Sequence, residues 1–278
     1  MTEQRFSVGA APQVLIAHID GDIHIEAWDE AAILVESDGK IRELYQEGEA
    51  LMVQNCNDDL SLRVPGGAQI RIEHSHGDLD ISGVAAVSCD HISGDVEIES
   101  IGGPVELGNL AGDLEIDGAP EVRAAKHIGG DVELRSVARA ELQHISGDLQ
   151  TSGVPALRLG QVDGDVEIIG LAESLEAEHI SGDLELEAAP QAAVSVGDVG
   201  GDVELRGGRR MQCGQIGGDC SITSPLVDTL MLGNVGGHLE APQVEELRLG
   251  NVGGDVELAG VTARARSAMS AAMRTSAV

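Results

Sequence analysis

The sequence predicts an all-β fold: a single-chain parallel β-solenoid (β-helix) of about eleven coils of 17–19 residues, with an N-terminal β cap. Two patterns carry this prediction. A Gly-Asp dipeptide returns at nearly constant spacing, and apolar residues recur at fixed positions around it. A third observation is the scarcity of aromatic residues, since 278 residues include one Trp, one Tyr and one Phe. Together these features indicate stacked coils around a narrow aliphatic interior.

Glycine followed by aspartate marks the repeat. Between residues 77 and 254 the marker glycines are 17 to 19 residues apart, and His238 replaces the aspartate once. Self-similarity at a fixed period is the signature of a repeat architecture. The marker glycines are Gly77, Gly94, Gly112, Gly130, Gly147, Gly164, Gly182, Gly201, Gly218, Gly237 and Gly254, and Gly21 precedes them in the same context.

Each unit of the repeat reads as short strands joined by a corner. With the marker glycine as position zero, apolar residues recur at −7, −5, −2, +2 and +4. Alternation with period two indicates strand, and the slip in parity between −5 and −2 requires a corner. Gly and Asp suit that corner, and strands of this length bury an apolar face only by stacking. One set is Leu157, Leu159, Val162, Val166 and Ile168.

The two ends differ from the repeat. We expect an N-terminal β cap region at 1–72, the repeat array at 73–260, and a basic Ala/Met-rich tail at 261–278 that is helical or disordered. A cap is expected because an open solenoid end exposes unpaired strands. The aromatic residues all fall before residue 50, outside the regular array: Phe6, Trp28 and Tyr45.

Other repeat classes fit less well. The segment "VEELRLGNV" (244–252) is similar to a leucine-rich repeat, but that class needs 20–29 residues per unit. A β-helix of hexapeptide repeats would place an apolar residue every six positions, and the parity slip in this chain breaks that pattern. Calcium-binding nonapeptide arrays would repeat every nine residues, whereas Gly-Asp returns here about every eighteen.

The net negative charge of the chain limits the kinds of partner that it can bind. The formal net charge is −31, and all 48 acidic residues precede residue 261. Such a chain repels phosphate backbones, so we expect no nucleic-acid or anionic-membrane binding. We see neither a signal peptide nor a membrane span, and no CxxC motif among the four cysteines. A cytoplasmic location with reduced thiols is expected.

Two acidic columns follow from the period. We interpret the aspartate column as acceptors of backbone N–H groups at the corners, and the glutamate column as a solvated face. The alternative is a row of weak divalent-cation sites suited to Ca²⁺. The aspartate column (+1) is Asp78, Asp95, Asp113, Asp131, Asp148, Asp165, Asp183, Asp202, Asp219 and Asp255. The glutamate column (+3) is Glu97, Glu115, Glu133, Glu167, Glu185, Glu204, Glu240 and Glu257.

A third polar column, the corner column, lies at −3. We expect a ladder of hydrogen-bonding side chains there. In one alternative, the pairs His74/His91 and His127/His144 hold a transition metal. A separate hypothesis is that titration of the histidines of this column near carboxylates tunes self-association. Its members are His74, His91, Asn109, His127, His144, Gln161, His179, Asp198, Gln215, Asn234 and Asn251, with His18 at the same place before Gly21.

No catalytic site is predicted. Cys89, Cys213 and Cys220 fall at apolar positions and are expected to be core thiols, and no His-Asp pairing marks a nucleophile. Acidic residues are so frequent that no pair stands out for glycosidase chemistry, and no aromatic platform for sugars follows residue 45. We therefore assign no catalytic, cofactor-binding or metal residue and predict that the protein is not an enzyme.

Two stretches carry a family resemblance: "RFSVGAAPQVLIAHIDGDIHIEAWDEAAILVES", and "LSLRVPGGAQIRIEHSHGDLDISGV" running into "ISGDVEI" units. They resemble a bacterial family of adhesin-like domains of unknown function. The resemblance extends to about residue 260 and implies a β-solenoid, attachment at a cell surface, and no catalytic residues. A weaker resemblance to bactofilins implies a coil stack that polymerises end to end.

These observations favour a non-catalytic function. The preferred prediction is a rigid acidic scaffold or interaction protein, which binds a protein partner or associates with itself. The first alternative is a self-polymerising filament protein of the bactofilin kind, and the second is an adhesin or polysaccharide-binding protein.

Overall fold

The structure is a computed structural model that describes residues 2–224, 227–267 and 273–275. Every regular element in these ranges is a β-strand, as the alternating apolar pattern predicts. The all-β prediction is confirmed. The same ranges contain no helix with the length and apolar character that a membrane crossing requires.

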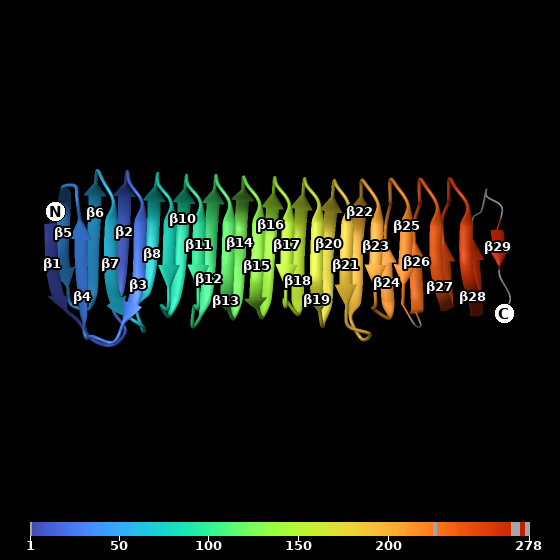
Figure 1. Cartoon of the computed structure of the whole chain (residues 1–278), viewed down its shortest axis with the longest axis horizontal. Coiled ribbons are helices and arrows are strands. Elements are labelled where there is room, and N and C mark those ends of the chain that lie inside the picture. Colours follow the sequence, from blue (N-terminus) through green and yellow to red (C-terminus); the bar gives the residue numbers. More distant parts are fainter. Residues whose placement is uncertain (1, 225–226, 268–272, 276–278) are drawn as a thin grey trace. The chain divides into compact units, whose positions relative to one another are not determined.

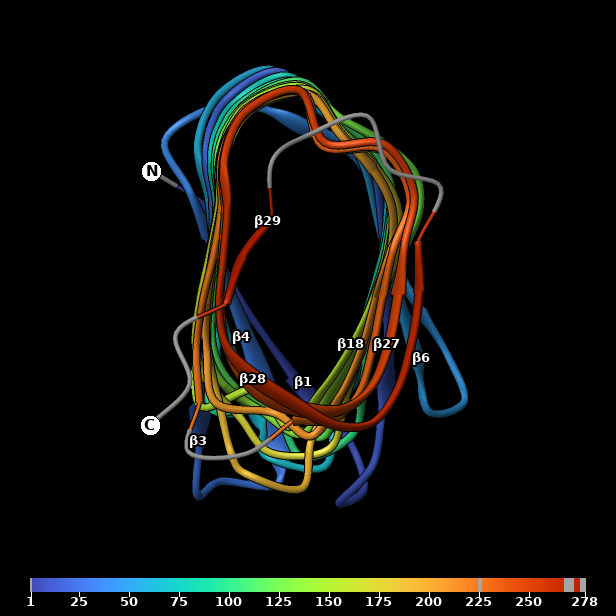
Figure 2. The same ribbon diagram turned by 90° about the vertical axis from the view of Figure 1, so that its right-hand side faces the viewer.

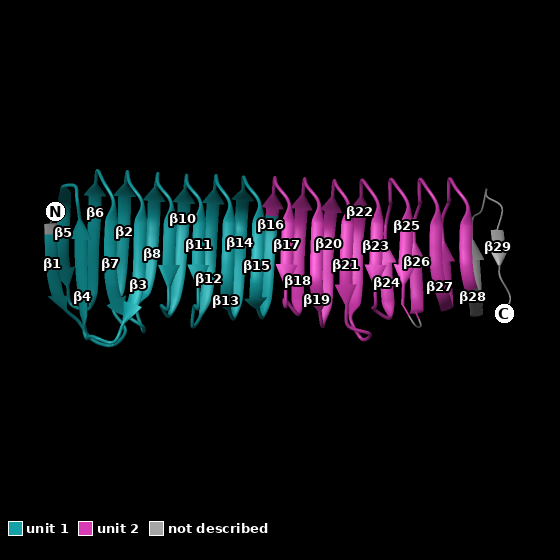
Figure 3. Ribbon diagram, in the orientation of Figure 1, with its two compact units in different colours: residues 1–143 teal, residues 144–278 magenta. Residues whose placement is uncertain are grey.

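The chain divides into two compact units, residues 1–143 and 144–278, coloured separately in Figure 3 and labelled by strand in Figure 1. The first unit holds β1 (Thr2–Ser7), β2 (Gln13–Ile19), β3 (Ile23–Trp28), β4 (Ala32–Ser37), β5 (Ile41–Glu47), β6 (Ala50–Cys56), β7 (Leu60–Pro65), β8 (Gln69–Ser75), β9 (Leu79–Ser82), β10 (Ala86–Ile92), β11 (Val96–Glu99), β12 (Pro104–Leu110), β13 (Leu114–Ala119), β14 (Glu121–Ile128) and β15 (Val132–Val137).

The boundary falls inside β16 (Arg139–Ile145). The second unit continues with β17 (Leu149–Ser152), β18 (Ala156–Val162), β19 (Val166–Leu171), β20 (Ser174–Ile180), β21 (Leu184–Ala188), β22 (Ala193–Val199), β23 (Val203–Arg206), β24 (Arg210–Cys213), β25 (Cys220–Thr223), β26 (Val227–Leu232), β27 (Leu239–Leu249), β28 (Val256–Ser267) and β29 (Met273–Thr275).

A coil consists of two strands on opposite long sides of a flattened loop (Figure 2). In the first unit β10 forms one side and β11 the other. β10 pairs in parallel with β8 and β12, whereas β11 pairs in parallel with β9 and β13. Each coil therefore adds one strand to each of two parallel sheets, whose inner faces enclose the core.

The second unit stacks in the predicted register. Val166 lies opposite Leu184 and Ile168 opposite Leu186 on the next coil. The prediction that successive coils lie directly on one another is confirmed. The predicted inward positions of one coil are each at most 2% exposed: Leu157, Leu159, Val162, Val166 and Ile168.

The coil has a second corner that the sequence reading did not identify. It lies six residues after the marker glycine, where Gly118 has a φ of 80° and Ser100 has a φ of 55°. This left-handed conformation is open to glycine and strained for residues with a Cβ. The same corner holds Gly83, Ser136, Gly153, Gly170 and Gly207, all with positive φ.

The N-terminal strands do not stack in sequence order. β2 pairs in parallel with β6 on one side and β8 on the other, and β3 likewise lies between β7 and β9. The region predicted as a cap therefore contains two parallel coils. The coil that comes first in the sequence, β2 with β3, lies between the later coil, β6 with β7, and the repeat array. Antiparallel pairing appears beyond them, in β1 with β4, β4 with β7, and β5 with β6.

Part of the tail is a strand, and the expectation of a helical or disordered tail is wrong for residues 261–267. β28 runs through 261–267 and pairs in parallel with β27, with Val261 opposite Val244 and Ala265 opposite Leu247. The edge of β27 offers unpaired N–H and C=O groups, and satisfying them outweighs the preference of an Ala/Met-rich segment for helix or disorder. β29 is also a strand, while 268–272 and 276–278 lie outside the described residues.

Among the described residues, two buried hydroxyl groups of the aliphatic core lack a hydrogen-bond partner. Ser75 is 2% exposed and Thr151 is 4% exposed, and neither hydroxyl oxygen has a hydrogen-bond partner. Thr151 lies opposite Ile168 in the next coil. A buried hydroxyl without a partner loses its hydration and gains nothing in exchange.

Replacing Thr151 by valine is therefore expected to stabilise the protein. Valine has nearly the same shape, so the change removes the unsatisfied hydroxyl without leaving a cavity, for a gain of about 1 kcal/mol in the free energy of unfolding. Chemical denaturation measures this gain. The control is Thr223→Val on β25, where the side chain is exposed and the expected change is close to zero. An equal effect of the two substitutions would contradict the conclusion that the buried Thr151 hydroxyl destabilises the core.

Candidate functional site

The aspartate column is a hydrogen-bonded ladder within each unit. In the second unit the amide of Asp165 donates to Asp148 Oδ1, and the amide of Asp183 donates to Asp165 Oδ1, both at 2.8 Å. In the first unit the amide of Asp95 donates to Asp78 Oδ1 at 2.9 Å. The prediction that these side chains accept backbone N–H groups is confirmed, and the donor is the amide of the aspartate one coil further on.

The marker glycine is required by this ladder. A Cβ added at Gly182 would lie 2.7 Å from the Gly164 carbonyl oxygen, and closer still to the Asp165 carboxylate. Both contacts are far inside van der Waals distance. Glycine at position zero therefore lets the backbone of one coil lie against the carboxylate of the previous coil.

The same ladder bears on the alternative interpretation of the aspartate column as a row of weak cation sites. Calcium takes six to eight oxygen ligands that converge on one point. In the column, Oδ1 of Asp78, Asp95 and Asp165 is directed instead to a main-chain donor of the next coil. In the described part of the chain, no three His, Cys, Asp or Glu side chains are grouped so that they could hold a metal ion.

The glutamate column lies on the outer face of the sheet that contains β11 and β13. Glu97 stands opposite Asp80 and Glu115 on the neighbouring strands. The pKa of Glu97 is raised above its usual 4.5, first by partial desolvation and then by the charges of Asp80, Glu115 and Glu99. Arg135 forms a salt bridge with Glu115 and so neutralises one part of the column.

Replacing Glu97 by glutamine is expected to stabilise the protein at neutral pH. A carboxyl group with a raised pKa binds protons more readily in the folded state, so stability rises as the pH falls through that value toward 4.5. The gain from Glu97→Gln should be below about 1 kcal/mol at pH 7, because solvent screens an exposed group, and should vanish near pH 4. Urea unfolding at the two pH values measures it.

Glu106→Gln is the matched control, because Glu106 lies opposite Arg123 on the next strand and gains nothing from losing its charge. A gain of the same size for Glu97→Gln at pH 4 and pH 7 would contradict electrostatic strain at this position.

The corner column forms a side-chain ladder in the first unit. The rings of His18 and His74 are 5.3 Å apart between centroids, and those of His74 and His91 are 5.0 Å apart. Asn109 Nδ2 lies 3.1 Å from His91 Nε2. The expected ladder is present here, although His74 and His91 meet by stacking of tilted rings.

The other members of the corner column are distributed between the units. His127 belongs to the first unit and His144 to the second, where His144 Nε2 lies 3.6 Å from Asp163 Oδ2. Further along, Asp198 Oδ1 accepts the amide of Gln215 at 2.9 Å. The corner column thus also uses side-chain acceptors for main-chain donors of the next coil.

A serine and a histidine approach each other without forming a nucleophilic site. Ser181 Oγ lies 3.4 Å from His179 Nε2, and both residues are exposed. In the described part of the chain no carboxylate contacts His179, so nothing orients the imidazole as a base. This pair is best described as a surface contact between residues two apart in sequence.

The cysteines lie in the core. All four are free and buried. Burial raises the pKa of the Cys89 thiol to about 12, with a further contribution from Asp90, and burial alone raises that of Cys213 to about 12. Burial also raises the pKa of Cys220, and Cys213 adds to it. These thiols are protonated at neutral pH, as expected of core residues and not of nucleophiles.

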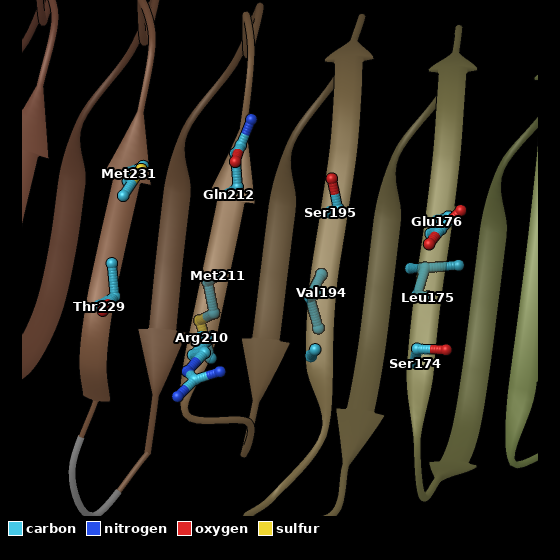
Figure 4. Close-up of a pocket in the computed structure, with 11 residues that line it drawn as sticks. Ser174, Leu175, Glu176, Val194, Ser195, Arg210, Met211, Gln212, Thr229 and Met231 are labelled. Atoms are coloured by element: carbon cyan, nitrogen blue, oxygen red, sulfur yellow. The ribbon is translucent and has the colours of Figure 1, made fainter.

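A shallow groove of about 330 Å³ lies over β20, β22, β24 and β26 of the second unit. Figure 4 shows Ser195, Gln212 and Met231 on three neighbouring strands at this place. Ala193 and Ser195 are small, while Glu176 lies on one side of them and Arg210 on the other. The lining offers mixed hydrogen-bonding groups and no nucleophile with a base. Sequence reasoning missed this groove, whose signal is the run of small outward residues in β22.

Comparison with known proteins gives a family. A family model described as Toastrack DUF4097 matches residues 20–224. No curated protein and no solved structure matches the chain significantly. The family model carries no assigned function and indicates no enzymatic activity.

Proposed function

The chain belongs to the toastrack DUF4097 family, and on that premise we propose that it is a non-catalytic scaffold whose acidic face binds a basic protein partner. All four cysteines are free and buried, which suits a reducing compartment such as the cytoplasm. The described residues present ladders and flat strand faces and no arrangement of nucleophile, base and orienting group. Function then resides in a surface of fixed geometry.

The main support for this proposal is the glutamate column of the second unit. Glu167, Glu185 and Glu204 lie opposite one another on β19, β21 and β23. Strands in one sheet are about 4.8 Å apart, so the carboxylates form a row that a flexible acidic segment would not hold. Arg206 contacts Glu185 at 3.0 Å and Glu204 at 2.7 Å, and it is far outnumbered by acids.

The opposite face of the second unit differs in charge. Arg158 lies 3.8 Å from Glu176, and Arg248 lies 3.1 Å from Glu246. Each of these pairs has one base for one acid, whereas Arg206 is shared between two glutamates of the column, Glu185 and Glu204. Complementary charge accelerates encounter and fixes orientation, so a basic partner is expected on the glutamate face.

A lysine-rich peptide serves as the probe. We expect the double variant Glu185→Gln/Glu204→Gln to bind it about tenfold more weakly at low salt, which corresponds to about 1.4 kcal/mol, as measured by fluorescence anisotropy. The control Glu176→Gln/Glu246→Gln changes the net charge equally on the other face and should retain the affinity. Equal weakening in both variants would show that only net charge matters and would refute a specific face.

Self-association is the alternative function, and one observation favours it. Among the described residues, β28 pairs with β29 only over Val256–Leu258, and no other described strand lies beside the outer edge of residues 259–267. Such an edge can accept a strand of a second copy. Sedimentation velocity of the full chain over a concentration range tests this: discrete monomers at every concentration would exclude it, and fibres would support it.

A further inference from the structure

One rung of the aspartate column in the second unit is a histidine. The amide of His238 donates to Asp219 Oδ1 at 2.7 Å, as an aspartate in this position would. The amide of Asp255 then donates to His238 Nδ1 at 2.9 Å. His238 therefore uses a ring nitrogen where Asp202 and Asp219 of the same column use a carboxylate oxygen.

The two acceptors respond differently to protons. A carboxylate keeps its acceptor oxygens throughout the neutral and mildly acidic range. An imidazole nitrogen accepts only while its lone pair is free, so the bond from Asp255 requires the neutral ring with its proton on Nε2. In the imidazolium ion both nitrogens carry protons, and Nδ1–H would face the N–H of Asp255.

We propose that His238 is a proton-sensitive rung, which holds the amide of Asp255 when the ring is neutral and releases it when the ring is protonated. The released amide belongs to the corner between Asn251 and Val256, which precedes β28. Protonation thus loosens the corner at the junction of two specific coils, while rungs made of aspartate keep their bonds.

Acidic residues surround the ring in sequence and along the column. Asp219 lies one coil before it and Asp255 one coil after it, and Glu240 follows it on β27. The ring is exposed, so protons reach it without unfolding of the coil.

The test is amide hydrogen exchange of the full chain, observed by NMR and expressed relative to the intrinsic rate at each pH. Losing a net hydrogen bond of about 1 kcal/mol lowers protection about fivefold. We expect the protection of the Asp255 amide to fall about fivefold or more between pH 8 and pH 5, the range in which histidines change charge. The Asp219 amide, which donates to Asp202 Oδ1 at 2.7 Å, is the internal reference and should not change.

Two variants separate the protonation effect from a general effect of acid. His238→Asn keeps a neutral acceptor without a titratable group, and the same unit has a precedent, since Asn234 Oδ1 accepts the amide of Asn251 at 3.2 Å. Its Asp255 amide should be equally protected at both pH values. His238→Ala removes the acceptor and should leave that amide weakly protected at both.

A long-range nitrogen–proton correlation of the imidazole gives a second readout, in which Nδ1 should lack a proton at pH 8. The proposal is overturned if Nδ1 carries the proton at pH 8, if the Asp255 amide keeps its protection at pH 5, or if His238→Asn loses protection as the native protein does.

Discussion

Replacing Gly94 by alanine is expected to destabilise the first unit by about 3–5 kcal/mol. A Cβ at this position would lie 2.6 Å from the Gly77 carbonyl oxygen, and closer still to the Asp78 carboxylate. This steric clash can be relieved only if the two coils separate at the corner, and their separation breaks the hydrogen bond from the Asp95 amide to Asp78 Oδ1. The neighbouring coils fix both partners, so neither can move away cheaply. Urea unfolding of the full chain measures the loss.

Gly102→Ala is the matched control eight residues away. The nearest atom to a Cβ at Gly102 is 3.8 Å away, an ordinary contact, and alanine there should change stability by less than about 1 kcal/mol. Similar losses of stability for the two substitutions would mean that glycine is needed at Gly94 only for its backbone freedom, and not for the close approach of the coils. A small loss for Gly94→Ala alone would mean that the ladder can open without consequence.

Much of the coil follows from local sequence. The alternation around each marker glycine specifies which residues face the core, and the parity slip locates the first corner; the buried set ending in Val166 and Ile168 agrees with it. The second corner had a signal as well, because glycine recurs six residues after the marker, as in Gly118 and Gly153. A reading centred on Gly-Asp leaves that second glycine unexplained.

The order of the N-terminal layers does not follow from the sequence. β2 and β6 carry equivalent alternating patterns, and either could pair with β8. The choice depends on how β4 and β5 fold back in antiparallel fashion, a property of tertiary packing. The tail depends on tertiary packing in the same way: its Ala/Met-rich composition favours helix or disorder, whereas the open edge of β27 makes a strand of 261–267.

The candidate site was partly predictable. Aspartate after glycine at a corner indicates a side-chain acceptor, and the ladder confirms it. The donor could not be inferred, because it belongs to the coil one period later and depends on vertical register. The acceptor role of His238 Nδ1 and the groove beside Ser195 depend on the same register, so they emerge only once the coils are stacked.

The inserted position of β3 makes Ile25 a core residue with partners on both sides. It is 0% exposed and lies opposite Leu62 on β7 and Ile81 on β9. Ile25→Ala is expected to lower the free energy of unfolding by about 3–4 kcal/mol, because layers on both sides prevent the cavity from collapsing. Urea unfolding of the full chain measures the change.

Tyr45→Ala distinguishes an inner layer from a dispensable cap. Tyr45 lies on the edge strand β5 and is 46% exposed, so its truncation should lower stability by less than about 1 kcal/mol. If residues 13–28 formed only an outer cover, Ile25 would have a partner layer on one side, and the neighbouring structure could close over the cavity. A loss for Ile25→Ala as small as that for Tyr45→Ala would therefore contradict the order in which β6, β2 and β8 are stacked.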